Sequence, residues 1–265
     1  MTAQRMFLLE LGRERVPKSL SVLGAGDHPI TTPVYGVLVE TSDGLVLLDT
    51  GLGGTALADT PAMEALYGGP DMLPSGPDGE PLEVALTELG FTVDDISLAA
   101  VSHLHLDHTG GVPMLTAAAV PVVIHEDEIA YGRDKAAQGT EREVAFWKSD
   151  YTLPATQWRT VAGDEQIAPG VHVLRTPGHT PGHLSYRVDL SDTGTWLFAA
   201  DAADLGENLL ERVPCGSTAE ADDVPRALAS VNRLMDEGDR LDARVVPGHD
   251  AVFWKAVWHP RGGHR

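Results

Sequence analysis

The six residues HLHLDH, at positions 103–108, bring three imidazoles and one carboxylate together in one short stretch of the chain. They follow the nearly continuous apolar run Ile96–Val101, a pattern typical of a strand that is covered on both faces. A strand end holds the backbone rigid, while the loop after it allows side chains to converge. Imidazole and carboxylate are the ligands of zinc and of other borderline divalent metals. This stretch therefore predicts a metal site at the end of a buried strand.

Three further strand ends carry residues of the same kind. The sequence TPGH (176–179) follows one apolar stretch, an Asp follows a second, and PGH (247–249) follows a third. A Pro-Gly turn directs the next side chain away from the strand. One such His is most often a turn residue, but four placements of this type in one chain reinforce one another. The ligand candidates at these three ends are His179, Asp201 and His249.

Strand and helix patterns alternate along the chain, with one hairpin expected around the turn residues 42–44. The expected strands are Met1–Leu11, Val34–Glu40, Leu45–Asp49, Ile96–Val101, Val120–Ile124, Val171–Arg175, Leu184–Val188, Trp196–Ala200 and Arg244–Val246. The expected helices are Glu83–Leu89, Glu126–Tyr131 and one with Pro225 in its first turn. This alternation predicts an α/β protein with two sheets and helices outside them, in a single domain that spans residues 1–265.

The composition is that of an acidic globular protein. Lys and Arg total 19 against 39 Asp and Glu, which gives a formal net charge of -20. Such a surface repels nucleic-acid phosphates and anionic lipid headgroups, so neither is an expected partner. No run approaches the roughly 18 apolar residues that a membrane helix needs, and the single Cys215 cannot form an internal disulfide. We expect a cytoplasmic protein that acts on a small molecule, as a monomer or a homodimer.

HLHLDH, a later His, a later Asp and a final His resemble, in this order, the signature of the metallo-β-lactamase superfamily, and the resemblance covers nearly all of the chain. It implies an αββα four-layer sandwich, with two mixed sheets inside and helices outside, that binds two divalent metal ions. The implied ligands of one ion are His103, His105 and His179, those of the other are Asp107, His108 and His249, and Asp201 bridges both. Asp49 matches an early Asp of the family that orients ligand residues, and its alternative role is a turn cap at the strand end.

Within the superfamily the chain is most similar to the N-acyl homoserine lactonases. The similarity rests on TPGHTPGH (176–183), the 22-residue step from His179 to Asp201, GHD (248–250), and the acidic pair before HLHLDH, Asp94 and Asp95. It implies opening of a lactone ring, the reaction of quorum quenching. The chain departs from this group at Asp204, where the lactonases carry a Tyr that contacts the substrate carbonyl. Because an ionised Asp accepts hydrogen bonds and donates none, we expect Asp204 either to face a substrate donor or to point away.

Hydrolysis of a small cyclic ester is the expected reaction. Two metal ions lower the pKa of a bridging water toward neutrality, and one of them polarises the scissile carbonyl. The catalytic candidates are Asp201, as the bridge, and Asp107, which is placed to pass a proton to the leaving alkoxide. Zinc is the expected metal, with iron or manganese as alternatives. Alternative functions are a β-lactamase, a thioester hydrolase resembling glyoxalase II, and an iron-dependent redox enzyme of the same fold.

Several other residues carry weaker signals. His183 is expected to be structural or to support a ligand, and His125 is expected to precede a helix that opens with three acidic residues. The Gly- and Pro-rich segment that holds Met63 and Tyr67 either lines a substrate pocket or packs a small core of its own. The candidate substrate contacts are Leu106, Met63, Tyr67 and Asp204. We expect Cys215 to be a buried, inert thiol, and segment 135–165 has no assigned role.

Overall fold

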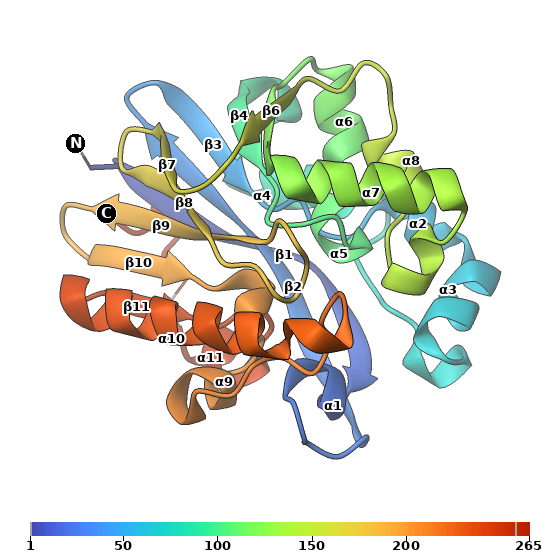
Figure 1. Ribbon diagram of the computed structural model, residues 1–265. Coiled ribbons are helices and arrows are strands. Elements are labelled where there is room, and N and C mark those ends of the chain that lie inside the picture. Colours follow the sequence, from blue (N-terminus) through green and yellow to red (C-terminus); the bar gives the residue numbers. More distant parts are fainter. Residues whose placement is uncertain (1, 258) are drawn as a thin grey trace.

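A computed structural model describes residues 2–257 and 259–265, so Met1, the start of the expected first strand, and Trp258 lie outside the described residues. Within them the strands form two mixed sheets (Figure 1). The first sheet has the order β1 (Arg5–Pro17), β2 (Pro29–Thr41), β3 (Gly44–Leu48), β4 (Ile96–Ala100), β5 (Val122–His125) and β6 (Trp158–Val161). The second has the order β11 (Arg244–Val246), β10 (Gly194–Phe198), β9 (Leu184–Leu190), β8 (Val171–Arg175) and β7 (Glu165–Ala168).

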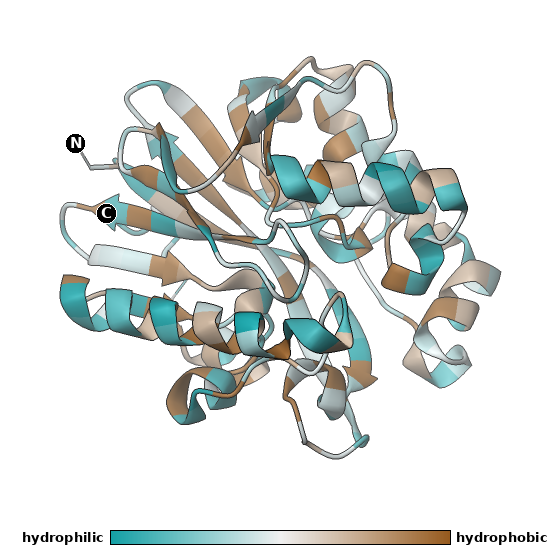
Figure 2. Ribbon diagram, viewed as in Figure 1, coloured by the Kyte–Doolittle hydropathy of each residue, from teal (hydrophilic) through white to brown (hydrophobic). Residues whose placement is uncertain are grey.

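Helices cover the outer faces of both sheets, and Figure 2 shows apolar residues along the strands and hydrophilic ones along the two long outer helices, α7 and α10. The helices beside the first sheet are α2 (Gly54–Ala58), α3 (Thr60–Tyr67), α4 (Pro81–Leu89), α5 (Leu106–Thr109), α6 (Val112–Ala117), α7 (Glu126–Gln138) and α8 (Lys148–Tyr151). The others are α1 (Lys18–Ser21), α9 (Gly206–Glu211), α10 (Val224–Leu241) and α11 (Ala251–Ala256). None of the helices in the described residues is long and apolar enough to cross a membrane.

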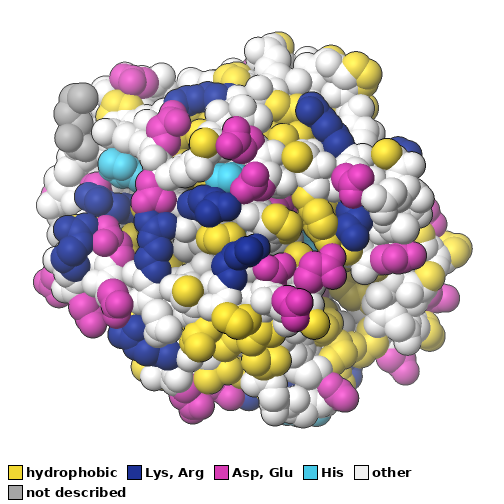
Figure 3. All heavy atoms as spheres, in the orientation of Figure 1, with side chains coloured by type: hydrophobic (Ala, Val, Ile, Leu, Met, Phe, Trp, Pro, Cys, Tyr) yellow, Lys and Arg dark blue, Asp and Glu magenta, His cyan; other side chains and the backbone are white. Residues whose placement is uncertain are grey.

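Three layers of buried side chains hold these elements together. Residues such as Val39 of β2 and Val188 of β9 pack between the two sheets. Leu86 of α4 belongs to the layer outside the first sheet, and Leu234 of α10 to the layer outside the second. On the face drawn in Figure 3, acidic and basic side chains are mixed, and apolar side chains gather in a patch at the lower centre. The αββα sandwich expected from the sequence is therefore confirmed.

Most expected elements are present, but some boundaries differ, and the first strand continues to Pro17 where the sequence predicts an end at Leu11. The hairpin forms between β2 and β3, and the helix expected at Glu126–Tyr131 continues to Gln138. Segment 60–67, which lacks helical periodicity, is nevertheless the helix α3. Asp59 caps it by accepting a hydrogen bond from the Ala62 N–H (3.2 Å), and Gly68 ends it in the left-handed conformation. Caps at both ends thus define this helix where the apolar pattern does not.

The loop after β3 packs tightly against the HLHLDH loop. Thr50 Oγ1 donates to the His108 carbonyl oxygen (2.7 Å) and accepts from the Gly111 N–H (3.0 Å). The Gly110 N–H donates to the Gly51 carbonyl oxygen (2.8 Å). A Cβ atom on Gly110 would lie 1.9 Å from the backbone nitrogen of Gly53, so only glycine fits between the two loops. This contact fixes the backbone that carries the ligand candidates.

We predict that Gly110→Ala destabilises the protein by about 1–3 kcal/mol or more, because the obstructing atoms are backbone and cannot rotate away. The measurement is urea-induced unfolding followed by circular dichroism. Gly163→Ala is the matched control, since a Cβ there meets nothing within 4 Å, and it should change the free energy of unfolding by less than about 0.5 kcal/mol. Equal unfolding midpoints for Gly110→Ala and the wild type would contradict the predicted close contact.

Candidate metal centre

The seven ligand candidates meet at one edge of the sandwich, where strands of both sheets end. His103 and His105 follow β4, and Asp107 and His108 lie in α5, directly after them. The other three come from the second sheet: His179 between β8 and β9, Asp201 after β10, and His249 after β11. The strand ends of both sheets therefore supply side chains to a single centre, as the sequence predicts.

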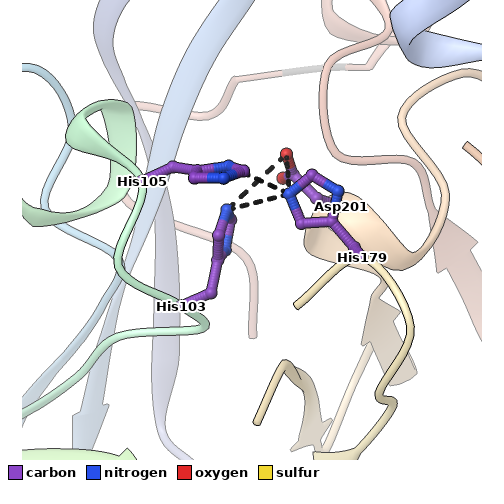
Figure 4. A group of neighbouring side chains, drawn as sticks. All are labelled: His103, His105, His179 and Asp201. Carbon is purple, nitrogen blue, oxygen red and sulfur yellow. Dashed lines mark hydrogen bonds and ion pairs between the residues drawn. The ribbon is translucent and has the colours of Figure 1, made fainter. Parts of the chain in front are cut away.

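His103, His105, His179 and Asp201 form the first ligand group, whose ligand atoms all lie within 4.8 Å of one another (Figure 4). His179 Nε2 lies 3.0 Å from His105 Nδ1 and 3.2 Å from His103 Nε2. Asp201 Oδ2 lies 3.3 Å from the same His179 nitrogen. Three imidazoles and one carboxylate thus surround a common point.

Asp107, His108 and His249 form the second ligand group, also within 4.8 Å of one another. Asp201 Oδ1 lies 3.1 Å from His108 Nε2 and 3.1 Å from His249 Nε2. Since its other oxygen faces the first ligand group, Asp201 stands between the two groups with one oxygen toward each. This is the position that a bridging ligand requires.

The imidazoles are oriented to present lone pairs to these points. His179 Nδ1 donates to the Ser217 carbonyl oxygen (3.0 Å), and His249 Nδ1 donates to the Pro33 carbonyl oxygen (2.9 Å), so both rings turn Nε2 toward the centre. In neutral His179 that Nε2 carries no proton. Burial lowers the pKa of His179, and it lowers the pKa of His105 to about 3. Two unprotonated ring nitrogens about 3 Å apart repel one another unless a proton or a metal ion lies between them. The residues present therefore fit a divalent metal ion in the first ligand group.

The second ligand group has a different charge balance. Burial opposes a charge on His108, but the carboxylates of Asp107 and Asp201 outweigh burial and raise its pKa well above the usual range. His108 Nε2 is buried and lies 3.2 Å from Asp107 Oδ2, but the two atoms are not aligned for a hydrogen bond. The buried carboxylates need positive charge nearby, and a metal ion replaces the protons that would otherwise supply it. This group therefore also fits a divalent ion.

Two residues named from the sequence hold the ligands from behind. Asp49 Oδ2 lies 3.0 Å from His108 Nδ1, while its Oδ1 accepts hydrogen bonds from the Ser102 N–H (2.6 Å) and the Tyr186 hydroxyl (2.8 Å). His183 is fully buried, and its Nε2 accepts a hydrogen bond from the Asp201 N–H (3.1 Å). Both residues contact the expected ligands without facing the centre.

Glu128 is a site residue that sequence reasoning missed. It lies fully buried in α7, where Oε1 accepts from the Leu104 N–H and Oε2 from the Gly182 N–H, both at 3.0 Å. Burial raises the pKa of Glu128 to about 7. The carboxylate joins the loop of His103 and His105 to the loop of His179. In the sequence it appears only as one of three acids at a helix start, and nothing there distinguishes it from its exposed neighbours Glu126 and Asp127.

A cavity of about 520 Å³ opens in front of the ligand groups. Leu106, Tyr67 and Asp204 line it, whereas Met63 does not and lies buried in the core outside the first sheet. Met63 and Tyr67 share one face of α3; the core covers the first and the cavity adjoins the second. Met63 is therefore not a cavity residue, which differs from the sequence-based expectation. Apolar members of the lining include Val16, Leu66, Val144 and Phe146.

Two acidic groups of the cavity wall are held by neighbouring side chains. The Tyr67 hydroxyl donates to Glu14, and burial raises the pKa of Glu14 to about 8. Cys215 Sγ donates to Asp204 Oδ1 (3.1 Å), and burial raises the pKa of Asp204 to about 7. Sequence reasoning missed Glu14, although its position between the exposed Arg13 and Arg15 of β1 is the alternation that marks an inward side chain.

Comparisons with known proteins show similarity in sequence and in fold. The model of the metallo-beta-lactamase superfamily matches residues 30–249. An N-acyl homoserine lactonase of Bacillus cereus is 29% identical over 256 residues, 94% of each chain. The N-acyl homoserine lactonase AttM of Agrobacterium fabrum is 33% identical over 172 residues, which cover 63% of this chain and 62% of that protein. A solved N-acyl homoserine lactone hydrolase, with N-hexanoyl-L-homoserine bound at its catalytic metal centre, has a TM-score of 0.83 at 27% identity and covers 97% of this chain and 98% of its own.

We predict that Glu128→Gln destabilises the protein by about 1–3 kcal/mol, because an amide has one acceptor oxygen and leaves one of two buried N–H donors unpaired. Chemical unfolding measures this loss. Glu126→Gln changes an exposed residue of the same helix, and it should cost less than about 0.5 kcal/mol. If both variants lost the same stability, the proposed joint between the two loops would be wrong.

Proposed function

The chain belongs to the metallo-beta-lactamase superfamily, and from this premise we propose that it is a dinuclear metal hydrolase that opens the ring of a small cyclic ester. The observation that carries the proposal is the pair of ligand groups that meet at Asp201. Two ions shared by one carboxylate are the arrangement that supports metal-assisted hydrolysis without a nucleophilic side chain.

In this proposal His103, His105 and His179 would hold the first ion, and Asp107, His108 and His249 would hold the second. Asp201 would be a ligand of both. Zinc suits the first ligand group best, because imidazole-rich sites with four ligand atoms are typical of zinc. When bound, the two ions supply acidification of a water and polarisation of the substrate carbonyl. Asp49 and His183 keep the ligand residues in position through the hydrogen bonds and close contacts already described.

Asp107 lines the cavity as well as belonging to the second ligand group. A carboxylate in this position is able to take up a proton during attack and deliver it to the alkoxide that leaves when the ring opens. Its Oδ2 lies 3.2 Å from His108 Nε2 and 3.6 Å from His249 Nε2. These neighbours fix one carboxylate oxygen, and the other is the candidate for proton transfer.

The proposed substrate is a lactone with an apolar substituent, such as an N-acyl homoserine lactone. Apolar side chains of the cavity, among them Leu106 and Phe146, would contact such an acyl group. The relatives that share this chain's length are named for this substrate, and one solved relative holds the ring-opened product at its metal centre. Activity on these lactones would make the protein a quorum-quenching enzyme.

A substrate panel tests the proposal. The purified protein, reconstituted with zinc, is assayed on N-hexanoyl homoserine lactone, γ-butyrolactone, a glutathione thioester and a β-lactam. We expect ring opening of at least one lactone at a higher kcat/KM than turnover of the other classes. A protein that hydrolyses the thioester or the β-lactam best would contradict the lactonase assignment while leaving a metal-dependent hydrolase in place.

We predict that the protein binds close to two divalent ions per chain and that Asp201→Ala removes nearly all hydrolysis while the chain stays folded. The reason is that Asp201 would hold both ions, one through each carboxylate oxygen, and its loss would remove a ligand from each position. Metal content, circular dichroism and turnover are the measurements. Asp239→Ala, an exposed change on α10, serves as the control and should behave as the wild type. Wild-type turnover in Asp201→Ala would contradict the dinuclear mechanism.

A further inference from the structure

Asp204 is placed beside the second ligand group by the backbone. Its carbonyl oxygen accepts a hydrogen bond from the His249 N–H (2.7 Å), so the residue lies beside the turn that carries His249. The residue is 6% exposed. Cys215 Sγ donates to Oδ1 (3.1 Å) from behind, which holds the carboxylate in one orientation. Asp204 is therefore a fixed, buried group at the edge of the centre.

One carboxylate oxygen of Asp204, one of Asp201 and one ring nitrogen of His249 lie within 4.8 Å of one another. Ligand bonds of about 2.0–2.2 Å allow two ligands of one ion to stand up to about 4.4 Å apart. Side-chain adjustments of a few tenths of an ångström are thus enough for all three atoms to reach one ion. Asp201 and His249 are both expected at the second metal position.

The ionised form of Asp204 also calls for a cation. Among the described residues it forms no salt bridge with a lysine or an arginine, and Cys215 donates to it only the weakly polar hydrogen of a thiol. A buried carboxylate is costly unless a positive charge or a metal ion compensates it. The metal-binding atoms that lie within 4.8 Å of an Asp204 oxygen belong to Asp201 and His249, and His249 is a member of the second ligand group.

We propose that Asp204 is an additional ligand of the second metal position. That position then has two imidazole nitrogens, from His108 and His249, and three carboxylate oxygens, from Asp107, Asp201 and Asp204. The first position has three imidazole nitrogens and one oxygen. Carboxylate-rich sites suit harder ions such as Mn²⁺. The preference for Zn²⁺ over Mn²⁺ should therefore be smaller at the second position than at the first. The inference rests on the proposed metal centre but is independent of which ester is hydrolysed.

Metal titration of metal-free protein tests this without any substrate. Binding of Mn²⁺ is followed by the electron paramagnetic resonance signal of free Mn²⁺, and binding of Zn²⁺ by competition with a chromophoric chelator. Asp204→Asn keeps the shape of the side chain and one acceptor for Cys215. In this variant one of the two equivalents of Mn²⁺ should bind at least about tenfold more weakly. Loss of a residue that only supports a metal ligand already weakens metal binding by about that factor, so loss of a ligand should do no less. The loss for Zn²⁺ should be smaller, and the tighter Zn²⁺ equivalent should be unchanged.

Asp223→Asn is the matched control, since Asp223 is also nearly buried but lies at the start of α10 and does not line the cavity. Circular dichroism establishes that both variants are folded. If Asp204→Asn does not fold, the test uses the wild-type protein. The ratio of Mn²⁺ affinity to Zn²⁺ affinity is then measured for each of the two bound equivalents, and equal ratios overturn the proposal. Unchanged affinities in a folded Asp204→Asn also overturn it, and an accompanying rise in KM for a lactone would identify Asp204 as a substrate contact instead. A wild-type protein that binds both ions but opens no lactone contradicts only the proposed function.

Discussion

Asp201 connects the two halves of the candidate metal centre, and the rest of the structure serves to place its two oxygens. One oxygen faces imidazoles of the first ligand group and the other faces His108 and His249. Asp201 comes from the second sheet, whereas His103 and His108 come from the first. The spacing of the centre thus depends on how the two sheets pack, and a close-packed interior resists shifts of even a fraction of an ångström.

Buried polar contacts between the sheets reinforce that packing near the centre. The Tyr186 hydroxyl of β9 reaches Asp49 at the end of β3, and the Tyr35 hydroxyl of β2 donates to the Pro247 carbonyl oxygen (2.7 Å), two residues before His249. Glu128 joins two ligand loops in the same way. A hydrogen bond in a low-dielectric interior is directional, and a buried donor or acceptor without a partner costs free energy. These contacts therefore favour one relative position of the two sheets. The apolar core supplies cohesion, and the polar joints supply the alignment.

The sequence predicts the parts of this arrangement that local chemistry dictates. HLHLDH and the three other strand-end residues were identifiable because ligand-type side chains after apolar runs are rare, and the structure brings all seven together. Features that depend on tertiary neighbours were not identifiable. Glu128 looks like its exposed neighbours, and only burial against two ligand loops gives it a role. The difference between Met63 and Tyr67 arises in the same way, because one helical face meets both the core and the cavity.

The charge of the ligand set bears on which bonds such a centre can break. Burial lowers the pKa of His103, His105 and His179, so these rings count as neutral ligands. Two divalent ions carry four positive charges, and Asp107, Asp201 and, as proposed, Asp204 would neutralise three of them. A centre with less residual charge acidifies water and polarises a carbonyl less strongly than one with only two carboxylates. Esters need less activation than amides, because their carbonyl carbon is more electrophilic and an alkoxide leaves more readily than an amide anion. An added carboxylate at this position therefore favours ester-type substrates, which is consistent with a lactone and weighs against an unstrained amide.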